Sequence, residues 1–144
     1  MTLRQWLLAG VLLPGLIAAA AAAADTAAPD AARGEQVYAR CLACHALAYD
    51  RVGPRHCGLF GRRAGSVPGF NYSLAMKRSG IVWNDPPLDR FLTQPLKMVP
   101  GSAMTYDGVA DPKDRADLIA YLKHVDGTPE CAKPEPQRVL PASQ

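Results

Sequence analysis

Five consecutive residues, Cys41-Leu42-Ala43-Cys44-His45, restrict the fold of this chain more than any other feature of its sequence. This Cys-x-x-Cys-His run is the attachment pattern of a c-type haem, in which both thiols add to the haem vinyl groups and the adjacent imidazole ligates the iron. Two residues between the cysteines span the distance between neighbouring vinyl groups. The run therefore predicts one covalently bound haem c, around which the chain must fold.

Two other kinds of site use closely spaced cysteines, and the rest of the chain argues against both. A thioredoxin-like dithiol follows a strand and opens a helix, whereas Cys41 and Cys44 close an expected helix and no strand pattern precedes them. A zinc site normally has a second closely spaced pair, whereas Cys57 and Cys131 are far apart in the sequence. Covalent haem attachment is therefore the preferred interpretation.

Residues 1–24 have the pattern of a secretory signal peptide. One cation, Arg4, precedes an apolar stretch from Trp6 to Ile17, and small residues continue to Ala24. A retained membrane anchor is the alternative, but a spanning helix needs about 20 apolar residues, more than this stretch contains. We expect cleavage to leave residues 25–144 as one exported domain in the periplasm.

Charge and hydropathy argue against two kinds of partner. The formal net charge of the 144 residues is +3, and Lys and Arg nowhere form the clusters that nucleic-acid binding needs. No later segment is long and apolar enough to span a membrane, so we expect no stable membrane insertion after cleavage. Export also places the four cysteines in an oxidising compartment, where thiols are usually paired or covalently used.

The remaining pattern predicts an all-α fold of a few short helices and long loops. Residues 52–70 are dense in Gly and Pro, which predicts an irregular loop. Short helices bury little apolar surface, so we expect the haem to fill the centre of a core at residues 30–126, with a tail at 127–144. Helix-start and helix-stop residues indicate helices from Asp30 to about Leu42, after Ser73 as far as Gly80, from Asp85 to before Pro95, and from Asp111 to Asp126.

Haem iron needs a sixth ligand, or an open position if the protein binds gas or performs catalysis. Met104 follows the turn-forming sequence Pro-Gly-Ser-Ala, which is able to direct a thioether inward, and it is the preferred ligand. His124 is better explained as a cation near a helix C-terminus, and His56 lies in the Gly-rich loop. Met98 is the more serious rival, although we expect it to pack beside a neighbouring valine; Met76 is the remaining candidate.

Several stretches between residues 34 and 123 resemble the class I cytochromes c, the mitochondrial-type and bacterial proteins with an N-terminal haem motif and a methionine ligand in the C-terminal half. The resemblance implies the cytochrome c fold, with a few short helices and long loops wrapped around one covalent haem. It also implies close packing of Gly34 and Tyr38 in the first helix against Leu118 and Tyr121 in the last. The matching stretches are 41–45, 53–54, 58–62, 68–72, 79–83, 100–104 and 115–123.

The resemblance implies specific roles for individual residues. His45 is the expected proximal iron ligand, oriented by the backbone carbonyl of Pro54, and Met104 is the expected distal ligand. Ser102 replaces a threonine that usually forms a hydrogen bond at this position. Three further side chains are expected near the haem propionates, namely Arg62, Tyr72 and Trp83.

The sequence departs from the mitochondrial pattern on the distal side and on the docking face. Phe91 replaces a tyrosine that often binds the methionine sulfur, and Met76 replaces an asparagine, so the distal side becomes more apolar. Leu96 and Ala103 occupy positions that are often lysine, which weakens electrostatic steering of partners. The remaining candidates for a basic docking ring are Arg40, Arg51, Lys97 and Lys113.

Haem attachment does not account for Cys57 and Cys131. In an oxidising compartment a disulfide between them is the simplest hypothesis. It would tie the tail at 127–144 to the Gly- and Pro-rich loop at 52–70, which we call the haem loop. Two unpaired thiols are the alternative.

Together these features predict an exported, monomeric, monohaem electron carrier that is not an enzyme. Its expected partners are membrane or periplasmic redox proteins, such as a quinol-oxidising complex, a terminal oxidase or a dehydrogenase. One alternative is a haem-based catalyst or ligand sensor in which the methionine ligand dissociates. Another is a haem subunit permanently docked to a membrane oxidoreductase.

Overall fold

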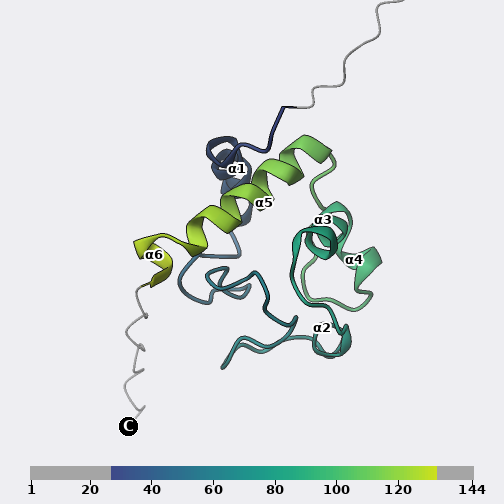
Figure 1. The fold of residues 1–144 in the computed structure, drawn as a ribbon. Coiled ribbons are helices and arrows are strands. Elements are labelled where there is room, and N and C mark those ends of the chain that lie inside the picture. The colour runs from purple at the N-terminus through teal and green to yellow at the C-terminus, as the bar shows by residue number, and fades with distance from the viewer. Residues whose placement is uncertain (1–26, 133–144) are drawn as a thin grey trace, which may run out of the picture.

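The computed structural model describes residues 27–132, so the expected signal peptide at 1–24 and most of the expected tail lie outside the described residues. Seven helical segments follow one another in this part of the chain (Figure 1). They are α1 (Ala31–Tyr38), the 3₁₀ helix η1 (Ala39–Cys41), α2 (Leu74–Arg78), α3 (Asp85–Thr93), α4 (Pro95–Met98), α5 (Pro112–Asp126) and α6 (Pro129–Ala132).

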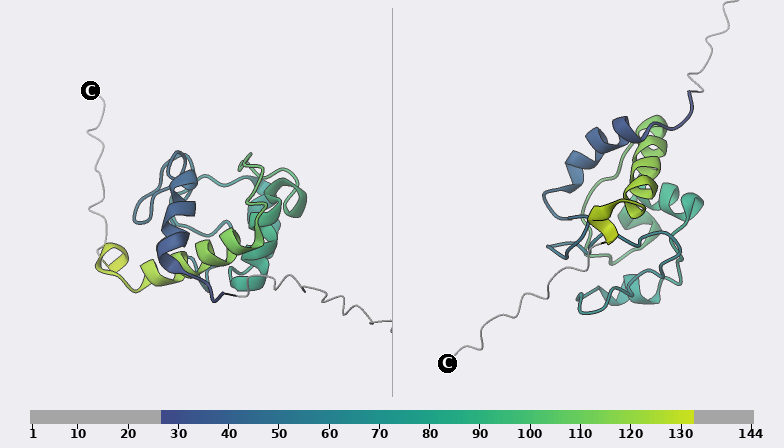
Figure 2. Two further views of the ribbon diagram at one scale, coloured as in Figure 1. Left: turned by 90° about the horizontal axis from the view of Figure 1, so that it is seen from above. Right: turned by 60° about the vertical axis from the view of Figure 1, so that its left-hand side comes forward.

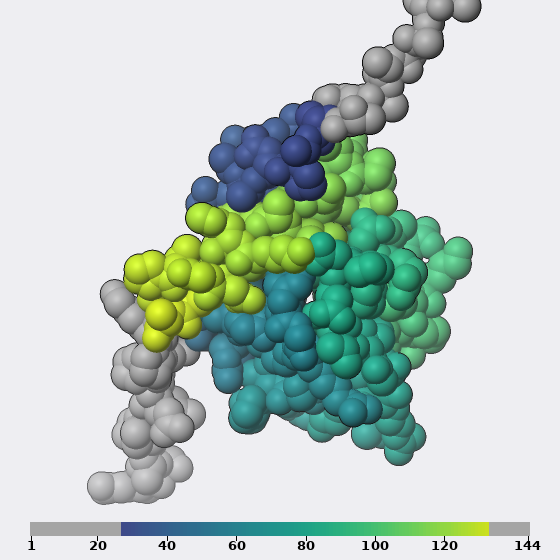
Figure 3. Space-filling model, viewed as in Figure 1, coloured from purple at the N-terminus to yellow at the C-terminus, as the bar shows by residue number. Residues whose placement is uncertain are grey.

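The first and last long helices, α1 and α5, cross and form the framework of the molecule (Figures 1 and 2). Asp30 caps α1 by accepting hydrogen bonds from the backbone N–H groups of Ala32 and Arg33. Asp111 caps α5 in the same way, with proline at the first helical position, where the missing N–H costs no hydrogen bond. The space-filling view shows α5 lying between α1 and the loops of the middle of the chain (Figure 3).

The crossing of α1 and α5 requires a glycine. A Cβ atom at Gly34 would lie 2.0 Å from the backbone oxygen of Asp117 and 2.7 Å from Cβ of Tyr121. The rings of Tyr38 and Tyr121 pack beside this contact with their centroids 5.2 Å apart. The close helix approach expected from the resemblance is therefore present.

The middle of the chain is mostly loop, as its glycine and proline content predicts. Among the described residues the β-structure amounts to one isolated antiparallel bridge between Arg63 and Val82. Ser73 caps α2, and α3 begins at Asp85 as expected. Two short helices were not expected: α4 follows α3 directly, and α6 lies just after α5. The all-α fold is confirmed.

The hydrophobic core is formed by side chains from α1, α3, α5 and the loops. Leu118 at the centre of α5 is 1% exposed. The buried apolar cluster includes Val37, Tyr38, Leu59, Trp83, Leu88, Phe91, Leu92, Val99, Val109, Leu118 and Leu122.

No helix between residues 27 and 132 has the length and apolarity needed to cross a membrane.

Candidate haem site

A cavity of about 510 Å³ lies between α1, α3, α5 and the loops that join them. This volume falls in the range of about 300–1,000 Å³ that is usual for ligand and cofactor pockets. Both cysteines and the histidine of the Cys-x-x-Cys-His run line it, together with Met104. The rest of its wall is largely apolar, contributed by residues such as Leu59, Trp83, Leu88, Phe91, Leu92, Leu118 and Leu122.

The imidazole of His45 is held by the loop that follows it. Its Nδ1 atom lies 2.8 Å from the backbone oxygen of Pro54, so the proton occupies Nδ1 and leaves the other ring nitrogen free to bind a metal. Burial lowers the pKa of His45, against the opposing effect of this hydrogen bond, and so favours the neutral ring. Gly53 lies against the ring, because a Cβ there would be 2.3 Å from Cε1.

The two cysteines of the run lie at the end of η1 and in the turn after it. Burial raises the pKa of the Cys41 thiol to about 11, and the smaller effect of Arg40 opposes that change. A redox-active dithiol needs the opposite shift, because its thiolate is the reactive form. Among residues 27–132 no group of three or more His, Cys, Asp or Glu side chains is placed to bind a metal ion. The site thus favours neither a dithiol nor a zinc centre.

Met104 is half-buried and lines the cavity, in the loop between α4 and α5. Its backbone N–H donates to the hydroxyl of Ser102, 3.2 Å away, and Ser102 is itself buried. Two of the other candidates lie elsewhere: Met98 does not line the cavity, and His124 is exposed near the end of α5. Met76 and His56 line the cavity as Met104 does.

Phe91 and Met76 are buried and also line the cavity. Both of the residues that depart from the mitochondrial pattern therefore face the space where Met104 lies. This wall is more apolar than a tyrosine and an asparagine would make it.

The three residues expected near the propionates all line the same cavity. Trp83 is buried and packs against Phe91 with ring centroids 5.1 Å apart. The guanidinium of Arg62 donates to the backbone oxygens of Arg55 and Cys57, at 2.9 Å each. Burial lowers the pKa of Arg62 and raises that of Tyr72, and their mutual interaction opposes both shifts.

His56 has a role in this site that its sequence position did not reveal. It lines the cavity, and its ring stacks on that of His45 with centroids 4.3 Å apart. Its Nδ1 atom shares a 3.0 Å hydrogen bond with the hydroxyl of Tyr38. Burial, with help from His45 and Arg62, holds the pKa of His56 well below its usual value.

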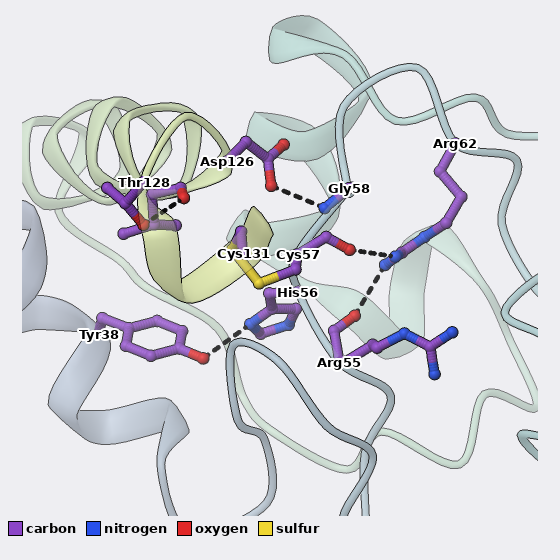
Figure 4. Close-up of a disulfide and its surroundings, with 10 residues drawn as sticks. Tyr38, Arg55, His56, Cys57, Gly58, Arg62, Asp126, Thr128 and Cys131 are labelled. Carbon is purple, nitrogen blue, oxygen red and sulfur yellow. Dashed lines mark hydrogen bonds between the residues drawn. A yellow bond between two sulfur atoms is a disulfide. The ribbon is translucent and has the colours of Figure 1, made fainter. Parts of the chain in front are cut away.

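The sulfur atoms of Cys57 and Cys131 lie 1.97 Å apart, at disulfide distance (Figure 4). Cys57 follows His56 in the haem loop, and Cys131 lies in α6. A second contact joins the same regions, because the carboxylate of Asp126 accepts a hydrogen bond from the backbone N–H of Gly58.

Comparison with known proteins agrees with this geometry. The family model described as cytochrome c matches residues 31–126. The chain belongs to the cytochrome c family. Members of this family bind a covalently attached haem c and carry electrons, and this chain is accordingly a monohaem electron-transfer cytochrome.

Similar proteins come from bacteria and eukaryotes. Cytochrome c2 of Rhodomicrobium vannielii is 48% identical over 99 residues, covering 67% of this chain and 79% of the relative. Cytochrome c2 of Blastochloris viridis is 44% identical over 119 residues, covering 79% and 94%. Among solved structures, cytochrome cH from Methylobacterium extorquens matches with a TM-score of 0.65 and 44% identity, covering 66% of this chain and 98% of that one.

Most of the cations expected in a basic docking ring have partners within the protein. Lys113 points to the buried carboxylate of Asp117 rather than to solvent. Arg40 pairs with Asp114 at 3.1 Å, and Arg51 donates to a backbone oxygen. Of the four expected members, only Lys97 has a side chain with no hydrogen bond or ion pair within the described part of the chain.

Proposed function

We propose that this cytochrome is an exported single-electron carrier whose haem iron is ligated by His45 and Met104. The supporting observation is that one cavity of suitable volume collects the Cys-x-x-Cys-His run and the thioether of Met104 on its wall. The thiols of Cys41 and Cys44 hold the haem by thioether bonds. When bound, the haem supplies an iron centre that cycles between ferric and ferrous states.

The residues around the cavity prepare it for electron transfer rather than for catalysis. Pro54 and Gly53 fix the neutral His45 ring, so the proximal ligand moves little when the iron changes charge. Apolar side chains around Met104 would exclude water from the iron on that side. If His45 and Met104 both bind the iron, no position would remain for a substrate, and a methionine ligand would favour the reduced state relative to a second histidine.

Residues 1–24 serve as the export signal in this proposal, and residues 25–144 form one periplasmic domain. Membrane or periplasmic redox proteins, such as a quinol-oxidising complex, a terminal oxidase or a dehydrogenase, exchange electrons with it. The similarity to bacterial cytochromes c2 supports this placement.

Visible spectroscopy of the purified holoprotein tests the ligand assignment. We expect a low-spin ferric spectrum with the weak long-wavelength band of methionine-ligated haem. Met104→Ala should lose this band and become high-spin, because its sixth position opens. Met98→Ala, the matched control, should retain it. A high-spin wild type would instead indicate the catalyst or ligand sensor.

We further infer that Cys57 and Cys131 form a disulfide that ties α6 to the haem loop. The bonding distance between their sulfur atoms and the nearby contact of Asp126 with Gly58 support it. In a chain-entropy account, closing a loop across 74 residues contributes up to about 4 kcal/mol, less here because the covalent haem already restricts the unfolded chain.

Alkylation and mass spectrometry test this bond. The denatured, non-reduced holoprotein should take up no label, because two cysteines are in thioethers and two in the disulfide. After reduction, Cys57 and Cys131 should each take up one label. Labelling of both without reduction would contradict the bond.

A further inference from the structure

The ring of His56 stacks on the His45 imidazole, and Gly53 also lies against that imidazole. The two rings are nearly parallel, with an interplanar angle of 18° and centroids 4.3 Å apart. A histidine at this place is not required for attaching haem or for completing the Cys-x-x-Cys-His run. Its contact with the expected proximal ligand therefore indicates another role for the His56 side chain.

The backbone around His56 is held by hydrogen bonds to two other parts of the chain. Its backbone N–H lies 3.1 Å from the oxygen of Ala46 and 3.0 Å from that of Leu47. The guanidinium of Arg62 binds the backbone oxygens of the residues on either side of it (Figure 4).

The ring of His56 is held separately from its backbone. The hydroxyl of Tyr38, from α1, shares a 3.0 Å hydrogen bond with its Nδ1 (Figure 4). Tyr38 is 2% exposed and packs edge-on to His56, with ring centroids 5.5 Å apart. The ring plane of His56 is therefore as well determined as its backbone.

A hydrogen bond and a stacked ring constrain the His45 imidazole in different ways. The bond from Nδ1 to the oxygen of Pro54 fixes one ring atom but leaves rotation about the N–H···O direction soft. A flat group against the ring opposes this rotation, because turning the imidazole would drive its edge into its neighbour. The stack thus adds a constraint on ring rotation to those given by the hydrogen bond and by Gly53.

We propose that His56, held by the Tyr38 hydroxyl, is a positioning residue that sets the plane of the His45 imidazole relative to the haem. The proposal rests on the proposed ligation of the iron by His45. Groups around a ligating histidine fix its orientation and tune the metal, and the ligand plane determines how unpaired spin spreads over the haem. His56 does not itself bind iron in this arrangement.

Proton NMR of the ferric holoprotein measures this plane, because the chemical shifts of the haem methyl groups depend on axial-ligand orientation. We expect His56→Leu, which removes the flat group, to change the order or the spread of these shifts. Tyr38→Phe keeps both rings but removes the hydrogen bond, so we expect a smaller change in the same direction. His56→Phe restores a flat face and should resemble Tyr38→Phe.

A double variant and a matched control separate positioning from general packing. Because Tyr38 acts through His56, the His56→Leu, Tyr38→Phe pair should shift no further than His56→Leu alone. Tyr121→Phe removes a neighbouring hydroxyl that has no hydrogen bond in the described residues, and it should leave the shifts unchanged while any loss of stability is measured by urea unfolding.

Two results would overturn the proposal, and they can be distinguished. A wild type without histidine and methionine ligation would overturn the proposed function and this proposal with it. A wild type with that ligation, whose methyl shifts are unchanged in His56→Leu and in Tyr38→Phe, would overturn the positioning role alone. If His56→Leu does not accumulate, Tyr38→Phe and His56→Phe give the same decision.

Discussion

The His45 imidazole has a backbone acceptor at one nitrogen and a glycine against its ring. Pro54 supplies the acceptor, and its proline ring keeps the backbone here from forming a helix. The φ angle of Gly53 is not in the left-handed region. A glycine is therefore needed here only because a side chain would not fit. A Cβ at this position would lie 2.6 Å from each ring nitrogen. The space that the imidazole occupies therefore depends on the absence of a side chain at Gly53.

Gly53→Ala should for this reason displace the imidazole or the loop around it. Overpacking of a filled site costs about 1–3 kcal/mol, so we expect urea unfolding of the holoprotein to show a loss of that size, together with a changed ferric spectrum. Gly127→Ala is the matched control, because its Cβ would meet its nearest atom at an ordinary 3.7 Å. Equal effects of the two substitutions would contradict this account.

Residue-level prediction succeeded where short spacing carries the information and failed where the fold brings residues together. The contact between His45 and Pro54 spans nine residues, and the resemblance was enough to expect it. The stack of His56 on His45 depends on how the Gly-rich loop folds back, and no periodic pattern encodes this. Lys113 was named as a candidate for the docking face; its ion pair with Asp117, four residues along α5, is a local contact that helical spacing could have indicated.

At the scale of elements, the crossing of α1 and α5 combines close approach with a buried charge. Asp117 is 0% exposed, and its Oδ1 accepts a 2.7 Å hydrogen bond from the backbone N–H of Asp30 as well as one from Lys113. Arg33 is an ion-pair partner of its Oδ2 at 3.1 Å. Burial raises the pKa of Asp117, but Lys113, Asp30 and Arg33 together outweigh it and lower the net pKa.

Asp117→Asn should destabilise the holoprotein by about 2 kcal/mol at neutral pH, because it weakens the charge-assisted hydrogen bonds that the buried carboxylate accepts from Lys113 and Asp30. The pKa of Asp117 is lower in the folded state, so its stabilisation is present above the ordinary value near 3.8 and is lost as the pH falls below it. Urea unfolding at pH 7 and below pH 4 should show that the difference in unfolding free energy between wild type and variant becomes smaller at the lower pH.

The exposed Asp107→Asn is the control for the buried carboxylate, because Asp107 has no hydrogen bond or ion pair in the described residues. It should change the unfolding free energy by less than about 0.5 kcal/mol at both pH values. A gap for Asp117→Asn that stays constant with pH would show that shape, not charge, explains its effect.

The helices that sequence predicts well are those with strong end signals. Asp30, Ser73 and Asp111 each cap a helix by accepting backbone N–H groups, and these caps are local. Proline at residue 95 was interpreted only as the end of α3, whereas it also suits the first position of α4. Helix α6 has four residues, too few to form alone, and it is held by contacts far away in sequence.

At the scale of the whole molecule, most of the cations expected in a docking ring around the cavity are engaged within the described residues. Leu96 is 44% exposed and Ala103 lines the cavity, at positions where the resemblance places lysines. Three of the four remaining cations are engaged by other groups of the protein. We therefore expect electrostatic guidance of a partner to this face to be weak, and apolar contact to supply more of the docking free energy.

Ionic strength measures this guidance through the oxidation of the ferrous holoprotein by an anionic reagent such as hexacyanoferrate(III). Salt screens charges beyond about 10 Å at 0.1 M, and strong steering accelerates association about 10- to 1,000-fold. We expect the native rate constant to change by less than about 10-fold between low and high salt. The Leu96→Lys, Ala103→Lys variant should react faster at low salt, and its rate constant should depend more steeply on salt concentration.

Ala32→Lys is the control, because it adds a cation at the start of α1, outside the cavity wall and away from the docking face. Its salt dependence should stay close to the native one. A salt dependence that steepens with each added cation wherever it is placed, so that Ala32→Lys lies midway between the native protein and the double variant, would show that total charge, rather than the placement of cations around the cavity, governs the encounter.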